Sequence, residues 1–121
     1  MLLVDDEPAV RSSTARLLRQ LGYTVLEAAS GLGAIGVVRV HEGPLALVIT
    51  DVVMPHVAGG ALAEWLREHR PEIRVMFITA YSGEIVDRET ILRHHALVVT
   101  KPFTPGMLAR SVRSVLDAGS R

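Results

Sequence analysis

The feature that most constrains the fold of this chain is a regular alternation of short apolar runs with longer segments of helical periodicity. The segments that predict β-strands, each rich in apolar residues, are residues 1–4, 23–28, 45–50, 74–79 and 96–100. The helical segments are residues 8–21, 30–40, 61–69, 82–93 and 105–118. Apolar strands that alternate with helices are typical of a parallel sheet with both faces covered. The chain therefore predicts a doubly wound α/β fold with five parallel strands and five helices.

Residues that favour helix ends support these boundaries. Asp6 is expected to cap the first helix, Pro8 to begin it and Gly22 to end it. Thr104 is expected to cap the last helix, with Pro105 at its first position. The residues predicted to face inward are Val10, Thr14, Leu17, Leu18 and Leu21 on the first helix, and Met107, Leu108, Val112, Val115 and Leu116 on the last.

Composition excludes several classes of protein. The chain has 121 residues, the size of one domain, and its hydrophobic fraction of 49% is too high for an intrinsically disordered segment. Because it contains no cysteine, disulfide scaffolds, iron–sulfur clusters and cysteine nucleophiles are excluded. Its formal net charge of zero argues against bulk electrostatic binding of nucleic acid.

The chain carries no signal of membrane insertion or export. No apolar run approaches the roughly 20 residues that a membrane-spanning helix needs. The N-terminus reaches Asp5 after four apolar residues, which is unlike a secretory signal peptide. We therefore expect a cytoplasmic domain without membrane contact, with residues 1–121 forming a single unit. Because the chain begins almost inside its first predicted strand, we also expect it to be a piece of a longer protein.

Polar side chains mark the ends of four of the five predicted strands. Asp5 and Asp6 follow the first strand, and Asp51 follows the third. Thr79 ends the fourth strand, and Lys101 follows the fifth. Functional groups of parallel sheets collect beyond the carboxyl ends of the strands, so we expect these residues at one edge. Clustered carboxylates repel one another unless a cation joins them, and Mg²⁺ prefers such oxygen ligands. A carboxylate can also be the nucleophile of phosphoryl transfer, while a hydroxyl and an ammonium group stabilise the phosphoryl oxygens.

Each of these signals has a simpler structural interpretation when it is taken alone. Asp5 and Asp6 could serve only as negative charge at the start of a helix, and Asp51 could be a helix cap. Lys101 is harder to dismiss, because it is the single lysine among 13 basic residues and it falls at a strand end. The occurrence of all four signals in order favours a functional site.

Four segments of the chain resemble the receiver domain of bacterial two-component response regulators. They are LLVDDEP, LVITDVVMPHVAGG, VMFITAYS and VVTKPF, and the resemblance covers essentially the whole chain. They occur in the family's order, with separations of 45, 28 and 22 residues along Asp6, Asp51, Thr79 and Lys101. The resemblance implies a flavodoxin-like sheet with strand order 2-1-3-4-5. The segments TAYSGEIV and KPFTPGMLARSVRSVLD look most like receivers attached to hybrid sensor kinases.

The resemblance implies a phosphoacceptor and a metal site. Asp51 would take a phosphoryl group from a kinase phosphohistidine in the presence of Mg²⁺ or Mn²⁺. Asp6 would be the main metal ligand, together with Asp51 and the backbone carbonyl of Val53. Asp5 would act largely through water. The chemistry would be limited to the chain's own phosphorylation and dephosphorylation, without turnover of a diffusible substrate.

The resemblance also implies a conformational switch. Thr79 would move to hydrogen-bond the phosphoryl group, and the small side chain of Ala80 would leave room for that movement. Lys101 would pair with the phosphoryl oxygens. Pro102 is expected to follow a cis peptide bond, which costs little before proline.

One position departs from the family pattern. Many receivers carry a Tyr or Phe three residues before the lysine, and this chain has Val98 there. The signal is therefore expected to travel through backbone shifts of residues 82–93 or through dimerisation by the last helix.

Val53 and Tyr81 bear on the lifetime of the phosphorylated state. Both side chains are bulky and neither is an acid or amide that could orient water, which predicts slow self-dephosphorylation.

The expected partner is a histidine kinase or a histidine phosphotransfer protein, and a homodimer is a second expectation. Residues 88–121 contain six bases and two acids, which favours a protein partner or a second copy over direct contact with nucleic acid. If the chain comes from a hybrid kinase, the parent protein would be a histidine kinase.

Two other interpretations stay open. A pseudo-receiver would bind its partners without phosphorylation. An aspartyl-phosphate phosphatase of the haloacid-dehalogenase class uses similar residues, although its nucleophilic Asp lies on the first strand and its acid pair comes late.

Overall fold

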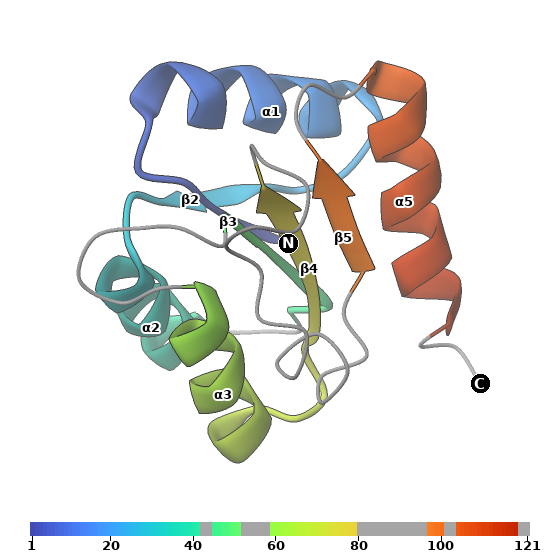
Figure 1. Ribbon diagram of the computed structural model, residues 1–121. Coiled ribbons are helices and arrows are strands. Elements are labelled where there is room, and N and C mark those ends of the chain that lie inside the picture. Colours follow the sequence, from blue (N-terminus) through green and yellow to red (C-terminus); the bar gives the residue numbers. More distant parts are fainter. Residues whose placement is uncertain (42–44, 52–58, 80–96, 101–103, 119–121) are drawn as a thin grey trace.

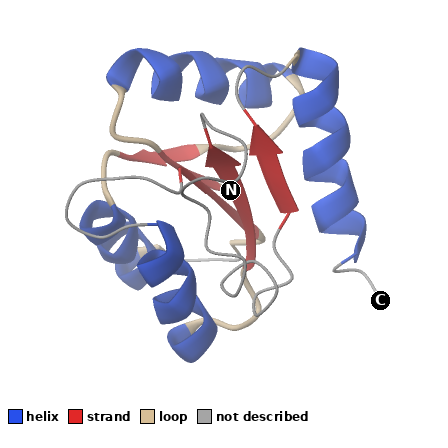
Figure 2. Ribbon diagram, in the orientation of Figure 1, coloured by secondary structure: helices blue, strands red, loops and turns tan. Residues whose placement is uncertain are grey.

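The chain folds into a parallel sheet with helices packed on both faces (Figures 1 and 2). The computed structural model describes residues 1–41, 45–51, 59–79, 97–100 and 104–118. The elements in chain order are β1 (Leu2–Val4), α1 (Pro8–Gln20), β2 (Leu26–Ala28), α2 (Gly31–Val40), β3 (Leu47–Asp51), α3 (Gly59–His69), β4 (Arg74–Thr79), β5 (Leu97–Thr100) and α5 (Pro105–Ala118). The helix predicted over residues 82–93 lies outside the described residues.

The five strands form one sheet in the order β2-β1-β3-β4-β5, and every strand pair is parallel. The predicted α/β class and strand order are thereby confirmed. The register pairs Val4 with Thr50, Asp51 with Ile78, and Thr79 with Thr100. The carboxyl ends of β1, β3, β4 and β5 therefore lie along one edge of the sheet.

Side chains of β1, β3 and β4 divide between two apolar cores, because successive residues of a strand point to opposite faces. The core beneath α2 and α3 includes Leu2, Val4, Ala34, Val38, Val48, Leu62 and Leu66. The core beneath α1 and α5 includes Leu3, Ala15, Leu18, Leu47, Ile49, Met76, Ile78, Leu108 and Val112. Burying each large apolar side chain contributes about 1.5–3 kcal/mol to folding. These two cores hold the strand ends in fixed relative positions.

Helix α1 begins as predicted at Pro8, but its N-cap is Glu7 and the predicted cap Asp6 is wrong. Glu7 has extended backbone angles (φ −91°, ψ 111°), the conformation favoured before a proline. Its N–H donates to the Asp5 carboxylate at 3.0 Å. The chain therefore turns between Asp5 and Glu7, and the cap position falls one residue later than predicted.

The end of α1 follows the sequence pattern in part. Gly22 lies just beyond the helix with a φ of +99°, a conformation that glycine adopts without the steric cost of a side chain. Thr14 and Leu18 are buried as predicted. The prediction for Leu21 is wrong, since its side chain is 44% exposed. Leu21 is the C-cap, where the chain is already leaving the helix and its packed face.

Helix α5 begins with the predicted cap. The N–H of Met107 donates to Oγ1 of Thr104 at 3.1 Å, and Pro105 is the first helical residue. Leu108 and Val112 are fully buried, which confirms their inward position. The prediction for Met107 is wrong, since its side chain is 40% exposed. The buried stripe runs through Leu108 and Val112 at a spacing of four and leaves Met107 at its margin.

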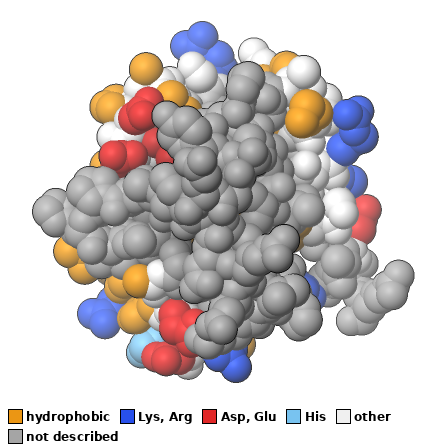
Figure 3. All heavy atoms as spheres, in the orientation of Figure 1, with side chains coloured by type: hydrophobic (Ala, Val, Ile, Leu, Met, Phe, Trp, Pro, Cys, Tyr) orange, Lys and Arg blue, Asp and Glu red, His pale blue; other side chains and the backbone are white. Residues whose placement is uncertain are grey.

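Figure 3 shows the molecule from the same side as Figure 1. Among the described residues, charged side chains of both signs lie around the rim of this view. No helix in the described part of the chain is long and apolar enough to cross a membrane.

Candidate metal and phosphoacceptor site

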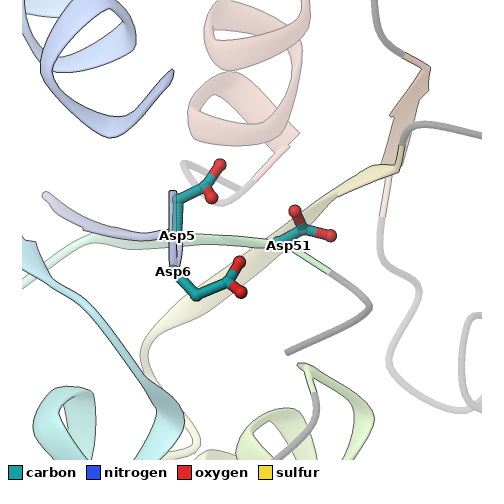
Figure 4. Close-up of side chains that lie close together, drawn as sticks. All are labelled: Asp5, Asp6 and Asp51. Carbon is teal, nitrogen blue, oxygen red and sulfur yellow. The ribbon is translucent and has the colours of Figure 1, made fainter. Parts of the chain in front are cut away.

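Three carboxylates meet at the carboxyl end of the sheet. Asp5 and Asp6 follow the last residue of β1, and Asp51 is the last residue of β3. Because Val4 lies beside Thr50, the next residue of each strand lies beside the other. One oxygen from each of the three carboxylates lies within 4.8 Å of the others (Figure 4). The structure therefore brings together the three acids that the sequence singled out.

The three acids differ in their exposure to solvent. Asp5 is only 4% exposed, Asp51 is partly buried and Asp6 is exposed. The cluster is therefore closed on the side of Asp5 and open on the side of Asp6.

Asp5 is held by both its backbone and its side chain. Its N–H donates to the carbonyl of Ala28 at 3.1 Å, which continues the pairing of β1 with β2 beyond Val4. Its carboxylate accepts the N–H of Glu7, and its carbonyl accepts Nη1 of Arg11 at 2.9 Å. These bonds fix the point where the chain leaves the sheet and carries Asp6 toward Asp51.

The donor set fits a hard divalent cation such as Mg²⁺. Each side chain offers anionic oxygen, the ligand type that Mg²⁺ prefers. Oxygens on opposite sides of one Mg²⁺ lie about 4 Å apart, because each metal–oxygen bond is about 2 Å long. Oxygens within 4.8 Å of one another therefore need only small side-chain rotations to share one ion. Such an ion would also offset the repulsion among three carboxylates.

The other residues singled out by the sequence are placed only in part. Thr79 is the last residue of β4 and Val98 lies in β5 beside Phe77, so both backbones belong to the sheet described above. Their side chains are not described. Val53, Ala80, Lys101 and Pro102 lie outside the described residues.

Arg11 and Glu27 are site neighbours that the sequence interpretation missed. Nε of Arg11 lies 3.4 Å from Oε1 of Glu27, and Nη1 of the same side chain binds the Asp5 carbonyl. No local pattern could have revealed this contact, because it depends on α1 packing beside β2. The sequence showed that Arg11 falls near the start of the helix that follows the acid pair, which does not identify its partners.

Known proteins provide an independent comparison. A sequence model of the response regulator receiver domain matches residues 1–113. The sensor kinase CckA of Brucella abortus is 37% identical over 117 residues, which cover 97% of this chain and 12% of CckA. The response regulator receiver protein CpdR of Brucella abortus is 30% identical over 118 residues, which cover 98% of this chain and 97% of CpdR. The chain thus spans a small part of one relative and nearly all of the other.

Solved structures share the fold. The response regulator protein TrrA of Thermotoga maritima, solved in complex with Mg²⁺-BeF, has a TM-score of 0.83 at 30% identity, covering 95% of this chain and 96% of TrrA. A probable two-component system response regulator/GGDEF domain protein has a TM-score of 0.88 at 28% identity, covering 99% of this chain and 50% of that chain. Sequence, fold and acid cluster agree, and the chain belongs to the response regulator receiver domain family of two-component systems.

Proposed function

We propose that this receiver domain accepts a phosphoryl group on Asp51 from a phosphohistidine, with Mg²⁺ or Mn²⁺ held by Asp5, Asp6 and Asp51. The observation that carries the proposal is the meeting of these three carboxylates at the carboxyl end of the sheet. The phosphohistidine would belong to a histidine kinase or a histidine phosphotransfer protein.

In the proposed reaction an Asp51 carboxylate oxygen forms a bond to phosphorus as the phosphorus–nitrogen bond breaks. The electron pair of that bond returns to the histidine nitrogen. Asp5 and Asp6 bind the cation and Asp51 supplies the attacking oxygen, while Thr79 and Lys101 are assigned to the phosphoryl oxygens by the family resemblance. When bound, the divalent cation neutralises charge on the transferred group. The carbonyl of Val53 is proposed as a further ligand.

Exposure to solvent favours Asp51 over Asp5 as the nucleophile. Asp5 is 4% exposed and Oδ1 of its carboxylate already accepts the N–H of Glu7, so Asp5 offers an incoming phosphorus atom less access than the partly buried Asp51. Asp6 is exposed, and only the match of the segment LVITDVVMPHVAGG to the family assigns the role to Asp51.

Phosphorylation by a small donor tests this proposal directly. Incubation with acetyl phosphate and Mg²⁺ should add one phosphoryl group to the protein, measured by intact-protein mass spectrometry. Asp51→Asn should abolish the gain, because an amide is not a nucleophile for phosphorus. Glu68→Gln, which removes an exposed acid on α3, should leave it unchanged. A wild-type domain that gains nothing would support the pseudo-receiver alternative, and a gain retained by Asp51→Asn would refute the assignment.

The proposal extends to the context of the domain. We propose that residues 1–121 form one cytoplasmic domain, which belongs either to a hybrid histidine kinase or to a stand-alone regulator. The match to CckA, of which this chain covers 12%, supports a kinase parent, while the match to CpdR over nearly its whole length supports a stand-alone regulator. Release of phosphate from added phosphomonoesters would favour the aspartyl-phosphate phosphatase alternative over a receiver domain in either context.

A further inference from the structure

Arg11 connects the acid cluster to the edge strand of the sheet. From the first turn of α1, its Nη1 donates to the carbonyl oxygen of Asp5 at 2.9 Å. Its Nε lies 3.4 Å from Oε1 of Glu27 on β2. The Arg11 side chain is 19% exposed and the Glu27 side chain 29%, so the contact is largely covered. One guanidinium thus joins the end of β1 to α1 and β2.

Glu27 is held from its other side by Arg19. Nη2 of Arg19 lies 3.2 Å from Oε2 of Glu27 and also donates to the carbonyl of Val25 at 2.8 Å. Each carboxylate oxygen of Glu27 therefore faces a different arginine. This arrangement restricts rotation of Glu27, and the Glu27 carboxylate in turn directs the guanidinium of Arg11 toward Asp5.

The bond from Arg11 acts on the peptide group between Asp5 and Asp6. The carbonyl of Asp5 and the nitrogen of Asp6 lie in one plane, so holding the oxygen fixes the plane from which Asp6 departs. Asp6 is exposed, and the direction of its carboxylate depends on this backbone. A rotation of the peptide would move the Asp6 oxygen out of its place within 4.8 Å of the Asp5 and Asp51 oxygens.

We propose that Arg11 is a positioning residue for the divalent cation site. Arg11 holds the Asp5–Asp6 peptide group in place, while Glu27 neutralises the charge of the Arg11 guanidinium. The proposal rests on the proposed function, because it concerns the same metal site. Charge alone predicts the opposite effect, since a guanidinium near the cluster repels a divalent cation. Removal of Arg11 therefore weakens cation binding if positioning dominates, and strengthens it if charge dominates.

Binding of Mn²⁺ alone, followed by electron paramagnetic resonance of the free ion, tests the proposal without phosphorylation. Arg11→Ala is expected to weaken Mn²⁺ binding by about tenfold, the size typical when a group behind metal ligands is removed. Arg16→Ala is the matched control, because it removes the same charge from an exposed position of the same helix, and it should change the affinity little. Unchanged or tighter binding in Arg11→Ala overturns the proposal.

A second substitution separates geometry from charge. Arg11→Lys keeps the positive charge but has no forked group that can reach Asp5 and Glu27 together. It should weaken Mn²⁺ binding about as far as Arg11→Ala, and wild-type affinity in this variant would also overturn the proposal. Phosphorylation of both variants by acetyl phosphate should recover at saturating Mg²⁺, because positioning changes the affinity and not the nucleophile. A rate that stays low at saturation contradicts a positioning role.

The proposed function itself is tested by Asp6→Asn in the same assay. If Asp6→Asn binds Mn²⁺ like the wild type, the metal site fails and the proposed function fails with it. If Asp6→Asn loses binding while Arg11→Ala keeps it, only the role of Arg11 is refuted.

Discussion

Val4 of β1 and Thr50 of β3 are register partners, and this pairing brings Asp5 and Asp51 to neighbouring positions at the end of the sheet. The distance between the acids is therefore set by strand pairing. A shift of one residue would turn the affected side chains to the opposite face of the sheet and separate the carboxylates. The two apolar cores, one on each face, stabilise this register.

Relative to the wild type, a variant with one acid of the cluster neutralised should be more stable without Mg²⁺ and less stable with it. Without the metal, Asp6→Asn removes repulsion from Asp5 and Asp51, and the free energy of unfolding should rise by about 1 kcal/mol. With free Mg²⁺ at about 100 times its Kd, the wild type should gain about 2.7 kcal/mol. The variant should gain much less, because it has lost a ligand. Urea unfolding in EDTA and in Mg²⁺ measures both effects.

Glu68→Gln controls for the general loss of a negative charge, since Glu68 is exposed on α3 outside the cluster. This variant should gain as much stability from Mg²⁺ as the wild type. Equal stabilisation of Asp6→Asn by Mg²⁺ would contradict a cation site at these carboxylates.

Replacing each of two glycines by alanine should change the free energy of unfolding in opposite directions. Gly22 has a φ of +99°, so Gly22→Ala should lower the free energy of unfolding by about 1–2 kcal/mol. Gly36 lies within α2, and a Cβ added there meets no atom within 4 Å. Gly36→Ala should therefore raise the free energy of unfolding by about 0.5–1 kcal/mol, because alanine favours the helix. Thermal unfolding of both variants checks the pair, and a loss of stability in Gly36→Ala would contradict the open surroundings of this residue.

The pKa of Asp117 lies below its ordinary value, because Arg113 one turn earlier on α5 donates to Oδ1 from Nε at 3.0 Å and from Nη2 at 2.7 Å. A carboxyl with a lowered pKa in the folded state stabilises the fold above its ordinary pKa. That contribution is lost as the pH falls through the lowered pKa. Both side chains are largely exposed, so the contribution should be small and should decrease with salt.

Titration of Asp117 by carboxyl carbon NMR measures this directly. The pKa of Asp117 should move up toward its ordinary value in Arg113→Gln, while Arg110→Gln on the same helix should leave it in place. An Asp117 pKa that is the same in the wild type and in Arg113→Gln would show that the ion pair does not form in solution.

The phosphorylated domain should lose its phosphoryl group slowly. Val53 and Tyr81 lie outside the described residues, and the prediction rests on their place two residues after Asp51 and Thr79 in the sequence. Neither side chain is an acid or amide that could orient the attacking water. The combined change Val53→Asn and Tyr81→Glu should speed the decay in Mg²⁺, followed by mass spectrometry. Decay at the wild-type rate in this double variant would refute the explanation.

Strand boundaries show where local pattern sufficed and where it failed. The prediction for residues 74–79 matches β4 at both ends, because the apolar residues 75–78 lie in a strand that has partner strands on both sides. The prediction for residues 23–28 was too long, since β2 comprises only Leu26–Ala28. Leu26 pairs with Leu2, the first residue of β1, so the strand begins where its neighbour β1 begins. The apolar pattern could not show the length of that neighbour.

The sequence by itself determined the α/β class, the alternation of elements and the acids at the strand ends, because apolar periodicity and strand termination are local properties of a chain. Only the tertiary structure decided that carboxylate oxygens of Asp5, Asp6 and Asp51 lie within 4.8 Å of one another. It also decided that Arg11 binds both the Asp5 carbonyl and Glu27. Those contacts join residues of different elements, and they exist because packing of the two cores sets which strands are neighbours and in which register.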